Sequence, residues 1–420
     1  MLDRTQAPPF AQADEINITK AETITLDNGV PVHIIRAGTQ PAVKLEVLLP
    51  AGKWYEPKNG LAWFTTKMLK EGTQNKSSEV ISSLFDFYGV EAEFETSLDR
   101  SEMSLKVMNK HLPDLLELVH EILYTPSFPD NELETLRNIK IQESRVENNQ
   151  NHTYASRKLR ENIYGTEHPY GKFFTEEAMR AISKQDIKDY HNSHIKDTEE
   201  FIIAGRVEDK HIDLLNRMFG QKELNKPSHN NSFTSSPGEK NLYVGKDHSL
   251  QTSLRLGKES ILKSHADYID LKIATTILGG YFGSRLMKNI REEKGYTYGI
   301  SSTLLPLEQS TLMIIGSDVI KEHREAAVSE IFSEIRKLRT EPVSESELDT
   351  VRNYMIGAFL GSIDTPSDIA EKFKNTHYLG LDYSYYHNFM DRVKNINPEK
   401  VIEVTNKYLH EDSLYQVLVG

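Results

Sequence analysis

The chain contains, at residues 60–73, the stretch GLAWFTTKMLKEGT, and this stretch decides how the rest of the sequence is interpreted. Its apolar residues recur at the i, i+3, i+4, i+7 spacing that places side chains on one face of a short helix, toward a core. Those residues are Leu61, Phe64, Thr65 and Met68. Trp63, Thr66 and Lys67 share another face, where i, i+3, i+4 spacing brings three side chains to a common point. Helices hold metal ions in this way, but these three positions carry no metal ligand.

The frame of this stretch resembles the zinc-binding helix of the insulinase and mitochondrial-processing-peptidase family, whose inverted motif is typically written G-L-A-H-F-L-E-H-M-L-x-x-G-T. The framework residues that match are Gly60, Leu61, Ala62, Phe64, Met68, Leu69, Gly72 and Thr73. The family's first histidine, glutamate and second histidine fall on Trp63, Thr66 and Lys67. Since neither an indole nor an ammonium group can bind zinc, the resemblance implies a degenerate metal motif, and we expect no zinc site in this chain.

The family's third zinc ligand is a glutamate on a downstream helix, and Glu143 in NIKIQESRVENNQN matches it. The sequence places Glu143 in an apolar seam with Leu136, Ile139 and Val146, where a carboxylate without a partner is disfavoured. Because the other ligands are missing, we expect Glu143 to be a surface or hydrogen-bonded glutamate.

A second informative stretch is SRLMKNIREEKGYTYGIS, residues 284–301. Its apolar spacing predicts a helix that Gly295 ends in a left-handed cap, followed by a strand. Arg291 then lies in the last turns of the helix and Tyr298 at the start of the strand. A guanidinium and a phenol in these places can donate hydrogen bonds to a peptide carbonyl and stabilise an oxyanion that develops on it.

This second stretch also resembles the family, whose second domain carries the pattern R-E-x-x-G-x-x-Y. Arg291, Gly295 and Tyr298 fit its spacing. The resemblance implies that Arg291 and Tyr298 bind substrate and transition state at a zinc ion of the first domain, which belongs to another subunit in two-chain members. The alternative is that Arg291 forms a salt bridge with a neighbouring helix and Tyr298 packs at a sheet edge.

The composition excludes several classes of protein. With 420 residues, of which 38% are hydrophobic and 27% charged, the chain can build large cores in two or more domains. The formal net charge is -12 and the basic residues form no block, so we expect no nucleic-acid partner. The absence of cysteine excludes disulfides, thiolate metal sites and cysteine nucleophiles.

No apolar run approaches the length of a membrane span, so we expect no transmembrane segment. The first residues, MLDRTQAPPFAQADE, contain prolines and acids where a signal peptide needs a continuous apolar core. We therefore expect a cytoplasmic protein, or a periplasmic one if a signal peptide was removed.

The chain also contains an internal repeat. TPSFPDNELETLRN, residues 125–138, aligns without gaps with TEPVSESELDTVRN, residues 340–353, and six of the fourteen positions are identical. Residues 118–122 resemble residues 331–335 in the preceding helix, two residues out of that register. Two matches in the same order indicate a duplicated domain of roughly two hundred residues.

Strand and helix patterns complete the prediction of the fold. Alternating apolar residues on both sides of Asp27, Asn28 and Gly29 predict a β-hairpin. We predict an α+β protein with an N-terminal domain at 1–225, a linker at 226–240 and a homologous C-terminal domain at 241–420. The resemblance implies that each domain is a mainly antiparallel sheet with helices packed on one face, and that the two form a clamshell.

The resemblance extends over nearly the whole chain and implies a function. We expect a chain that is inactive alone and forms part of a zinc-dependent metallopeptidase complex. Its partner would be a homologous subunit that carries the zinc, and the substrate an unfolded peptide. Whether the partner is another chain or a second copy of this one, and which peptides are cut, the sequence leaves open.

Two alternatives remain. The first is a purely structural or peptide-binding protein that kept the fold and lost proteolysis, as core subunits of a respiratory complex in this family have done. The second is a self-sufficient enzyme whose metal ligands come from elsewhere in the chain, such as His168 or His191.

Overall fold

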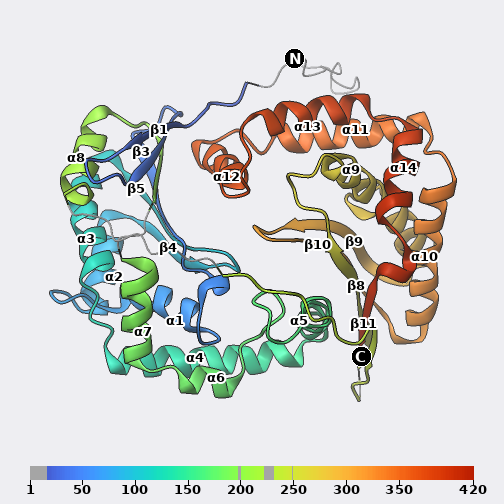
Figure 1. Ribbon diagram of the computed structural model, residues 1–420, viewed down its shortest axis with the longest axis horizontal. Helices are drawn as coiled ribbons and strands as arrows, with labels where there is room; N and C mark the ends of the chain where they lie inside the picture. The colour runs from blue at the N-terminus through green and yellow to red at the C-terminus, as the bar shows by residue number, and fades with distance from the viewer. Residues whose placement is uncertain (1–16, 197–199, 222–230, 248) are drawn as a thin grey trace, which may run out of the picture.

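The chain folds into two halves that face each other like the shells of a clam, as the computed structural model shows (Figure 1). Each half is built on one mainly antiparallel β-sheet with helices packed against it. The predicted α+β clamshell of two similar domains is thereby confirmed. The residues that the structure describes are 17–196, 200–221, 231–247 and 249–420.

The first half contains six strands and eight α-helices within the described residues. The strands are β1 (Glu22–Thr25), β2 (Pro31–Arg36), β3 (Ala42–Leu49), β4 (Glu91–Thr96), β5 (Ser101–Met108) and β6 (Glu200–Gly205). The helices are α1 (Leu61–Met68), α2 (Ser78–Tyr88), α3 (Leu112–Tyr124), α4 (Asp130–Asn149), α5 (Asn151–Tyr164), α6 (Glu176–Ala181), α7 (Lys184–Tyr190) and α8 (Asp209–Phe219).

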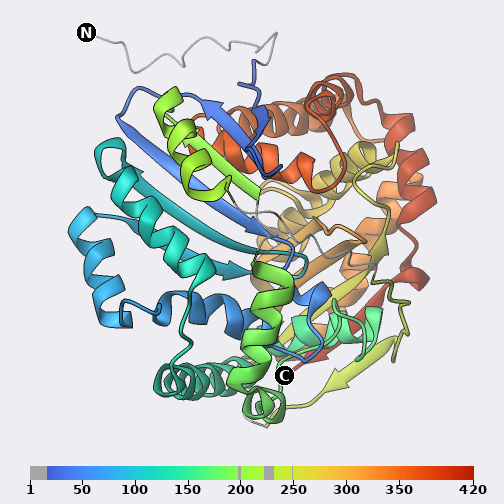
Figure 2. The same cartoon turned by 60° about the vertical axis from the view of Figure 1, so that its left-hand side comes forward.

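The first sheet has the strand order β1-β2-β6-β3-β5-β4, in which β2 and β6 run parallel and the other neighbours antiparallel. The predicted hairpin joins β1 to β2, with Glu22 opposite Ile34. Its turn includes Gly29, whose φ of 86° is a left-handed conformation that costs glycine little. Helices of the same half lie across the outer face of this sheet (Figure 2).

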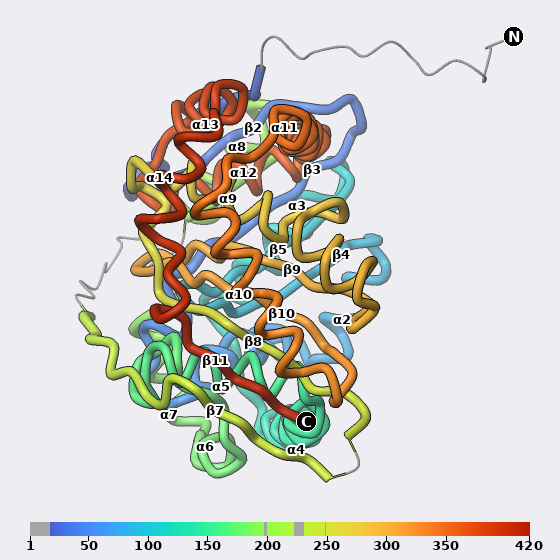
Figure 3. The backbone as a smooth tube through the Cα atoms, turned by 90° about the vertical axis from the view of Figure 1, so that its right-hand side faces the viewer, coloured from blue at the N-terminus to red at the C-terminus, as the bar shows by residue number. Residues whose placement is uncertain are grey.

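The second half has five strands and six α-helices within the described residues. The strands are β7 (Asn241–Val244), β8 (Gln251–Ser260), β9 (Thr297–Pro306), β10 (Thr311–Ile320) and β11 (Tyr415–Val419). The helices are α9 (Tyr268–Gly279), α10 (Arg324–Thr340), α11 (Glu345–Leu360), α12 (Pro366–His377), α13 (Ser384–Asn395) and α14 (Pro398–Tyr408), and a π-helical segment, η5, spans Met287–Glu293. Figure 3 shows α10 and α14 in front of this second sheet.

The second sheet repeats the order of five strands of the first, β2-β6-β3-β5-β4. Its strands run β7-β11-β8-β10-β9, and β7 and β11 are again the parallel neighbours. The helices α4 and α11 begin at Asp130 and Glu345, at the offset of 215 residues that the sequence repeat gives. The duplication predicted from the repeat is therefore visible in the architecture.

The two halves exchange one helix each. The helix α5 of the first half packs on β8 and β11 of the second sheet, and α12 of the second half packs on β2 and β6 of the first. As a result, both faces of the first sheet are buried. On β2, Ile34 packs in the core of the first half and Ile35 in the core of the second. Apolar burial on this scale resists separation of the halves.

The predicted linker, 226–240, lies only in part within the described residues, because residues 226–230 are outside them. From residue 231 on, the connection follows the end of α5, where the amides of Ser236 and Gly238 donate to the carbonyls of Tyr164 and Asn162 at 2.9 and 2.8 Å. The boundaries themselves stay a prediction. Every helix within the described ranges is too short or too polar to cross a lipid bilayer.

Candidate functional site

The helix α1 carries the degenerate metal motif. Gly60, with a φ of 93°, turns the chain into the helix, and Oε2 of Glu56 accepts hydrogen bonds from the first amides, those of Gly60 and Ala62, at 2.9 and 3.2 Å. A carboxylate at a helix N-terminus is favoured by the unpaired amides and by the helix dipole. The start of α1 is therefore held firmly in place.

The three motif positions on α1 have different surroundings. Thr66 is fully buried, and its hydroxyl donates to Oγ of Ser101 on β5 at 2.9 Å. The ammonium group of Lys67 lies 2.8 Å from Oε1 of Glu95 on β4. Trp63 is half-buried, and its indole packs against neighbouring aromatic rings. Each motif side chain thus has its own structural partner.

Lys140 on α4 connects two of the predicted positions. Its ammonium group lies 5.1 Å from the centre of the Trp63 ring and 3.1 Å from Oε2 of Glu143. A cation over the face of an indole is attracted by the ring's quadrupole. Trp63 and Glu143, which match the first and third zinc ligands of the family, therefore converge on an ammonium group.

Glu143 itself is exposed, and of the apolar seam expected around it only Leu136 packs against a core. Ile139 and Val146 are 50% and 59% exposed. The reason is that α4 buries its opposite face, with Leu133 and Ile141 in the core of the first half, and leaves the side with Glu143 open. Ile139 and Val146 have the predicted helical spacing, but they face solvent.

The chemistry of this group of side chains does not fit zinc. An indole and an ammonium group offer no lone pair to the metal, and the hydroxyl of Thr66 is bonded to Ser101. The ammonium groups of Lys67 and Lys140 would also repel a divalent cation. No catalytic step is therefore assigned to a metal at α1.

The second candidate pair lies where η5 leads into β9. Leu286, Met287 and Ile290 are buried, as the helical spacing predicts, and Gly295 turns the chain with a φ of 67°. Arg291 lies in the last turn of η5, and its guanidinium carbon is 4.5 Å from the centre of the Phe282 ring. The arginine is thus held by a ring rather than by an acid.

Tyr298 lies in a β-bulge at the start of β9. Opposite β10, Ser317 pairs with Ile300 but Val319 pairs with Thr297, so β9 has one extra residue here. The hydroxyl of Thr297 donates to the carbonyl of Gly299 at 2.9 Å and holds the bulge. Bulges redirect side chains, and the Tyr298 side chain is 91% exposed.

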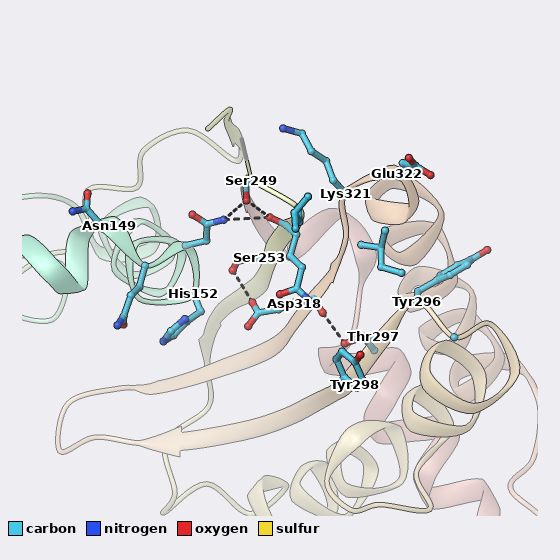
Figure 4. Close-up of a pocket in the computed structure, with 16 residues that line it drawn as sticks. Asn149, His152, Ser249, Ser253, Tyr296, Thr297, Tyr298, Asp318, Lys321 and Glu322 are labelled. Atoms are coloured by element: carbon cyan, nitrogen blue, oxygen red, sulfur yellow. Dashed lines mark hydrogen bonds between the residues drawn. The ribbon is translucent and has the colours of Figure 1, made fainter. Parts of the chain in front are cut away.

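A pocket of about 1070 Å³ adjoins Tyr298 (Figure 4). It is open to solvent and lined by the end of α4, the start of α5 and the ends of β8, β9 and β10. Figure 4 shows Tyr298 on the strand side, with Asn149 and His152 across the pocket. Arg291 is not among the residues that line it. Arg291 lies on η5 against Phe282, and of the two residues only Tyr298 lines this pocket.

Among the residues that the structure describes, no polar group engages either side chain of the pair. Within the described ranges, the guanidinium of Arg291 and the phenol of Tyr298 form no hydrogen bond or ion pair. The alternative of a structural salt bridge at Arg291 therefore lacks a partner there. Both groups can donate hydrogen bonds to a ligand at this edge.

His168 and His191, the alternative metal ligands, are buried and hydrogen-bonded to the backbone. His168 is buried, its Nδ1 accepts from the amide of Tyr170 at 3.1 Å, and burial lowers the pKa of its ring. His191 is buried as well, and its Nε2 donates to the carbonyl of Leu123 at 2.7 Å. Neither belongs to a group of three metal-binding side chains in the described part of the chain.

The contact of Lys140 with Trp63 and Glu143 was not predicted from the sequence. Its signal is present, because a lysine three residues before Glu143 is the spacing of a helical ion pair. Pairs of this kind are frequent in the chain, and nothing in the sequence shows that α4 passes close to Trp63.

Comparisons with known proteins agree with this architecture. The family model described as insulinase (peptidase family M16) matches residues 32–172, and the model described as peptidase M16 inactive domain matches residues 181–355. Together the two models cover well over half of the chain.

Relatives and a solved structure match over almost the full length. An uncharacterized zinc protease YmxG of Bacillus subtilis is 24% identical over 405 residues, 92% of this chain and 95% of the relative. A non-peptidase homolog YmxG of Helicobacter pylori is 20% identical over 415 residues, 97% of this chain and 93% of the relative. The crystal structure of an M16 inactive domain from Pseudomonas fluorescens has the same fold, with a TM-score of 0.86 and 22% identity over 95% of this chain and 98% of that one.

Proposed function

The chain belongs to the insulinase family, peptidase family M16, and on this premise we propose that it is the non-catalytic subunit of a two-chain zinc peptidase that degrades or processes unfolded peptides. It is an inactive-type member, in which Trp63, Thr66 and Lys67 stand in place of the family's zinc ligands and general base. The proposed partner is a homologous subunit with an intact H-x-x-E-H motif, which brings the zinc.

One observation carries the proposal. The metal position is filled by side chains that cannot bind zinc, while Arg291 and Tyr298 remain without polar partners among the described residues. Tyr298 is 91% exposed, so its hydroxyl is open to a ligand, and the guanidinium of Arg291 has no acid to hold it within the described residues. We propose that these two groups donate hydrogen bonds to the carbonyl oxygen of a peptide and stabilise the negative charge that develops on it during hydrolysis.

The sheet edges support a peptide as the substrate. The strands β4 and β9 are the last strands of their sheets, so each leaves a row of backbone groups open. An extended peptide can add to such an edge as a further strand. Tyr298 lies at the start of β9, next to the place where a peptide paired with that strand would lie.

The test combines the chain with its partner. We expect that the chain alone hydrolyses no unfolded peptide, that the mixture does, and that Arg291→Ala slows the mixture at least about tenfold without weakening assembly. The matched control is Lys288→Ala, which removes an exposed positive charge from the same segment. Equal rates for the Arg291→Ala and unmodified mixtures would remove the catalytic role of this residue.

The same experiment distinguishes the alternative. A purely structural or peptide-binding protein, for which the name of the Helicobacter pylori relative is the supporting observation, would assemble or bind peptide without adding to hydrolysis. In that case the partner would cut peptides equally well with and without this chain.

A further inference from the structure

Three side chains suited to metal binding meet where α12 crosses the inner face of the first sheet. His33 comes from β2, Glu200 is the first residue of the neighbouring β6, and His377 is the last residue of α12. One ligand atom of each residue lies within 4.8 Å of those of the other two. The group therefore joins two strands of the first half to a helix of the second, which Figure 1 shows beside that sheet.

The distances within the group match a metal site. Nε2 of His377 lies 3.1 Å from Oε2 of Glu200, and Nε2 of His33 lies 3.5 Å from the same oxygen. Zinc bonds of about 2.0–2.1 Å in a tetrahedron separate the ligand atoms by about 3.3 Å. A zinc ion therefore fits between these atoms after small rotations of the rings.

His33 is the most informative of the three. Its side chain is 2% exposed, and its Nδ1 lies 2.9 Å from the hydroxyl of Thr23. Either atom of this hydrogen bond can be the donor. When Nδ1–H donates to Thr23, a lone pair remains on Nε2, which is the tautomer that binds metals. Within the described residues, Nε2 of His33 has no hydrogen-bond partner.

In the tautomer with the proton on Nδ1, this arrangement favours a cation between His33 and Glu200. A lone pair on Nε2 of His33 that faces a carboxylate oxygen is repelled by it unless a proton or a metal ion lies between them. An unpaired, buried ring nitrogen is also costly in itself. Glu200 and His377 are 31% and 34% exposed, so water can reach a fourth position on a bound ion.

A neighbouring group of carboxylates provides the contrast. Glu46, Glu102 and Glu371 also cluster between the first sheet and α12. There the cation is already present, because the ammonium group of Lys374 lies 2.7 Å from Glu46 and 2.9 Å from Glu102. That group needs no metal, whereas no lysine or arginine pairs with Glu200 within the described ranges.

We propose that His33, Glu200 and His377 bind a zinc ion that fastens α12 to the first sheet. Two imidazoles and one carboxylate form a ligand set that suits zinc, with a water as the fourth ligand. The ion ties together the two halves of the clamshell, so binding stabilises the closed packing of α12. This site is separate from α1 and from the pair Arg291 and Tyr298. It departs from the expectation of a chain without zinc, which was drawn from the motif on α1 alone.

The test uses the isolated full chain, stripped of metal with a chelator and titrated with zinc chloride by calorimetry. We expect one equivalent of zinc to bind and to raise the melting temperature. His377→Ala and Glu200→Gln, both at partly exposed positions, should each weaken binding more than about a hundredfold. His387→Ala, an exposed histidine on the next helix, should bind like the unmodified chain.

Two results would overturn the proposal. One is that the stripped chain takes up no zinc, which would mean that a proton alone joins His33 to Glu200. The other is that His377→Ala and Glu200→Gln bind zinc as tightly as the unmodified chain. Melting curves in chelator show whether each variant is folded. No partner or peptide is used, so failure here leaves the proposed function untouched.

Discussion

The ammonium group of Lys140 lies 5.1 Å from the centre of the Trp63 indole ring. This contact places a protein cation beside a position at which the family resemblance puts a zinc ligand. The lysine also pairs with Glu143, so the remaining acid of the motif is neutralised without a metal. The first half has kept the shape of a zinc peptidase domain while its charges are balanced by side chains.

If the residues of α1 around the motif still have the family's geometry, three substitutions should restore the metal motif. The triple variant Trp63→His, Thr66→Glu, Lys67→His should bind zinc with Glu143 as the third ligand. Adding Lys140→Ala should tighten binding by about tenfold or more, because the competing ammonium group is gone. Zinc affinity is measured by competition with a coloured chelator.

The control for this rebuilding is Glu143→Gln in the same background, which should weaken binding. Both are compared in a chain that also carries His377→Ala, so that the second proposed site does not contribute. Binding that does not depend on Glu143 would show that this residue is not placed as a ligand.

Tyr298→Phe tests the phenol at the bulge. Removing one hydroxyl should lower kcat/KM of the complex about tenfold, since a donor to the transition state is lost. The free energy of unfolding should change by less than about 0.5 kcal/mol, because the side chain is 91% exposed. Steady-state rates and chemical denaturation of the same preparation give both values. A large loss of stability would instead indicate a structural role.

Lys374 should be essential to the contact between the halves. Its ammonium group lies 2.7 Å from Glu46 and 2.9 Å from Glu102, and the side chains of Lys374 and Glu46 are buried. Lys374→Met leaves Glu102 without its cation and Glu46 with Lys44 alone, and should destabilise the chain by about 3–5 kcal/mol. Urea unfolding measures this. Combining Lys374→Met with Glu46→Gln and Glu102→Gln should restore much of the loss, and an absence of any recovery would contradict the explanation.

Because of Glu56, the free energy of unfolding should decrease as the pH rises from about 4.5 to about 7. Burial raises the pKa of this carboxyl to about 7, although the amides of Gly60 and Ala62 partly oppose the shift. The folded state then keeps a proton that the unfolded state loses above its own pKa of about 4.5, so the stabilisation is complete below pH 4.5 and disappears as the pH rises through 7.

Glutamine cannot ionise. Glu56→Gln should therefore reduce the decrease in the free energy of unfolding over this pH range by about 2 kcal/mol. Melting temperatures at several pH values report it. The same change at the exposed Glu93 on β4 controls for the loss of a negative charge. An unchanged slope in Glu56→Gln would exclude this residue as the cause.

Local patterns in the sequence were sufficient for much of the fold. The hairpin at Gly29, the buried face of Leu286 and Ile290, and the repeat that places α4 and α11 all follow from spacing and turn chemistry. These features depend on neighbours in the chain, so one sequence is enough to predict them.

Contacts between distant segments could not be predicted in this way. The exchange of α5 and α12 between the sheets, the approach of Lys140 to Trp63, and the meeting of His33 with His377 depend on tertiary packing. The apolar seam beside Glu143 failed for the same reason, since periodicity identifies a face of a helix but not what covers it.

We propose that this chain forms one side of the substrate site and supplies two hydrogen-bond donors, Arg291 and Tyr298, to a peptidase whose catalytic zinc belongs to a partner. The most direct measurement is peptide hydrolysis by the complex that copurifies with the tagged chain from its native host, compared with hydrolysis by the isolated chain. We expect no hydrolysis by the isolated chain, and hydrolysis by the complex that stops when the first histidine of the partner's H-x-x-E-H motif is replaced. Peptide cleavage by the isolated chain, or a complex whose activity survives that replacement, would contradict it.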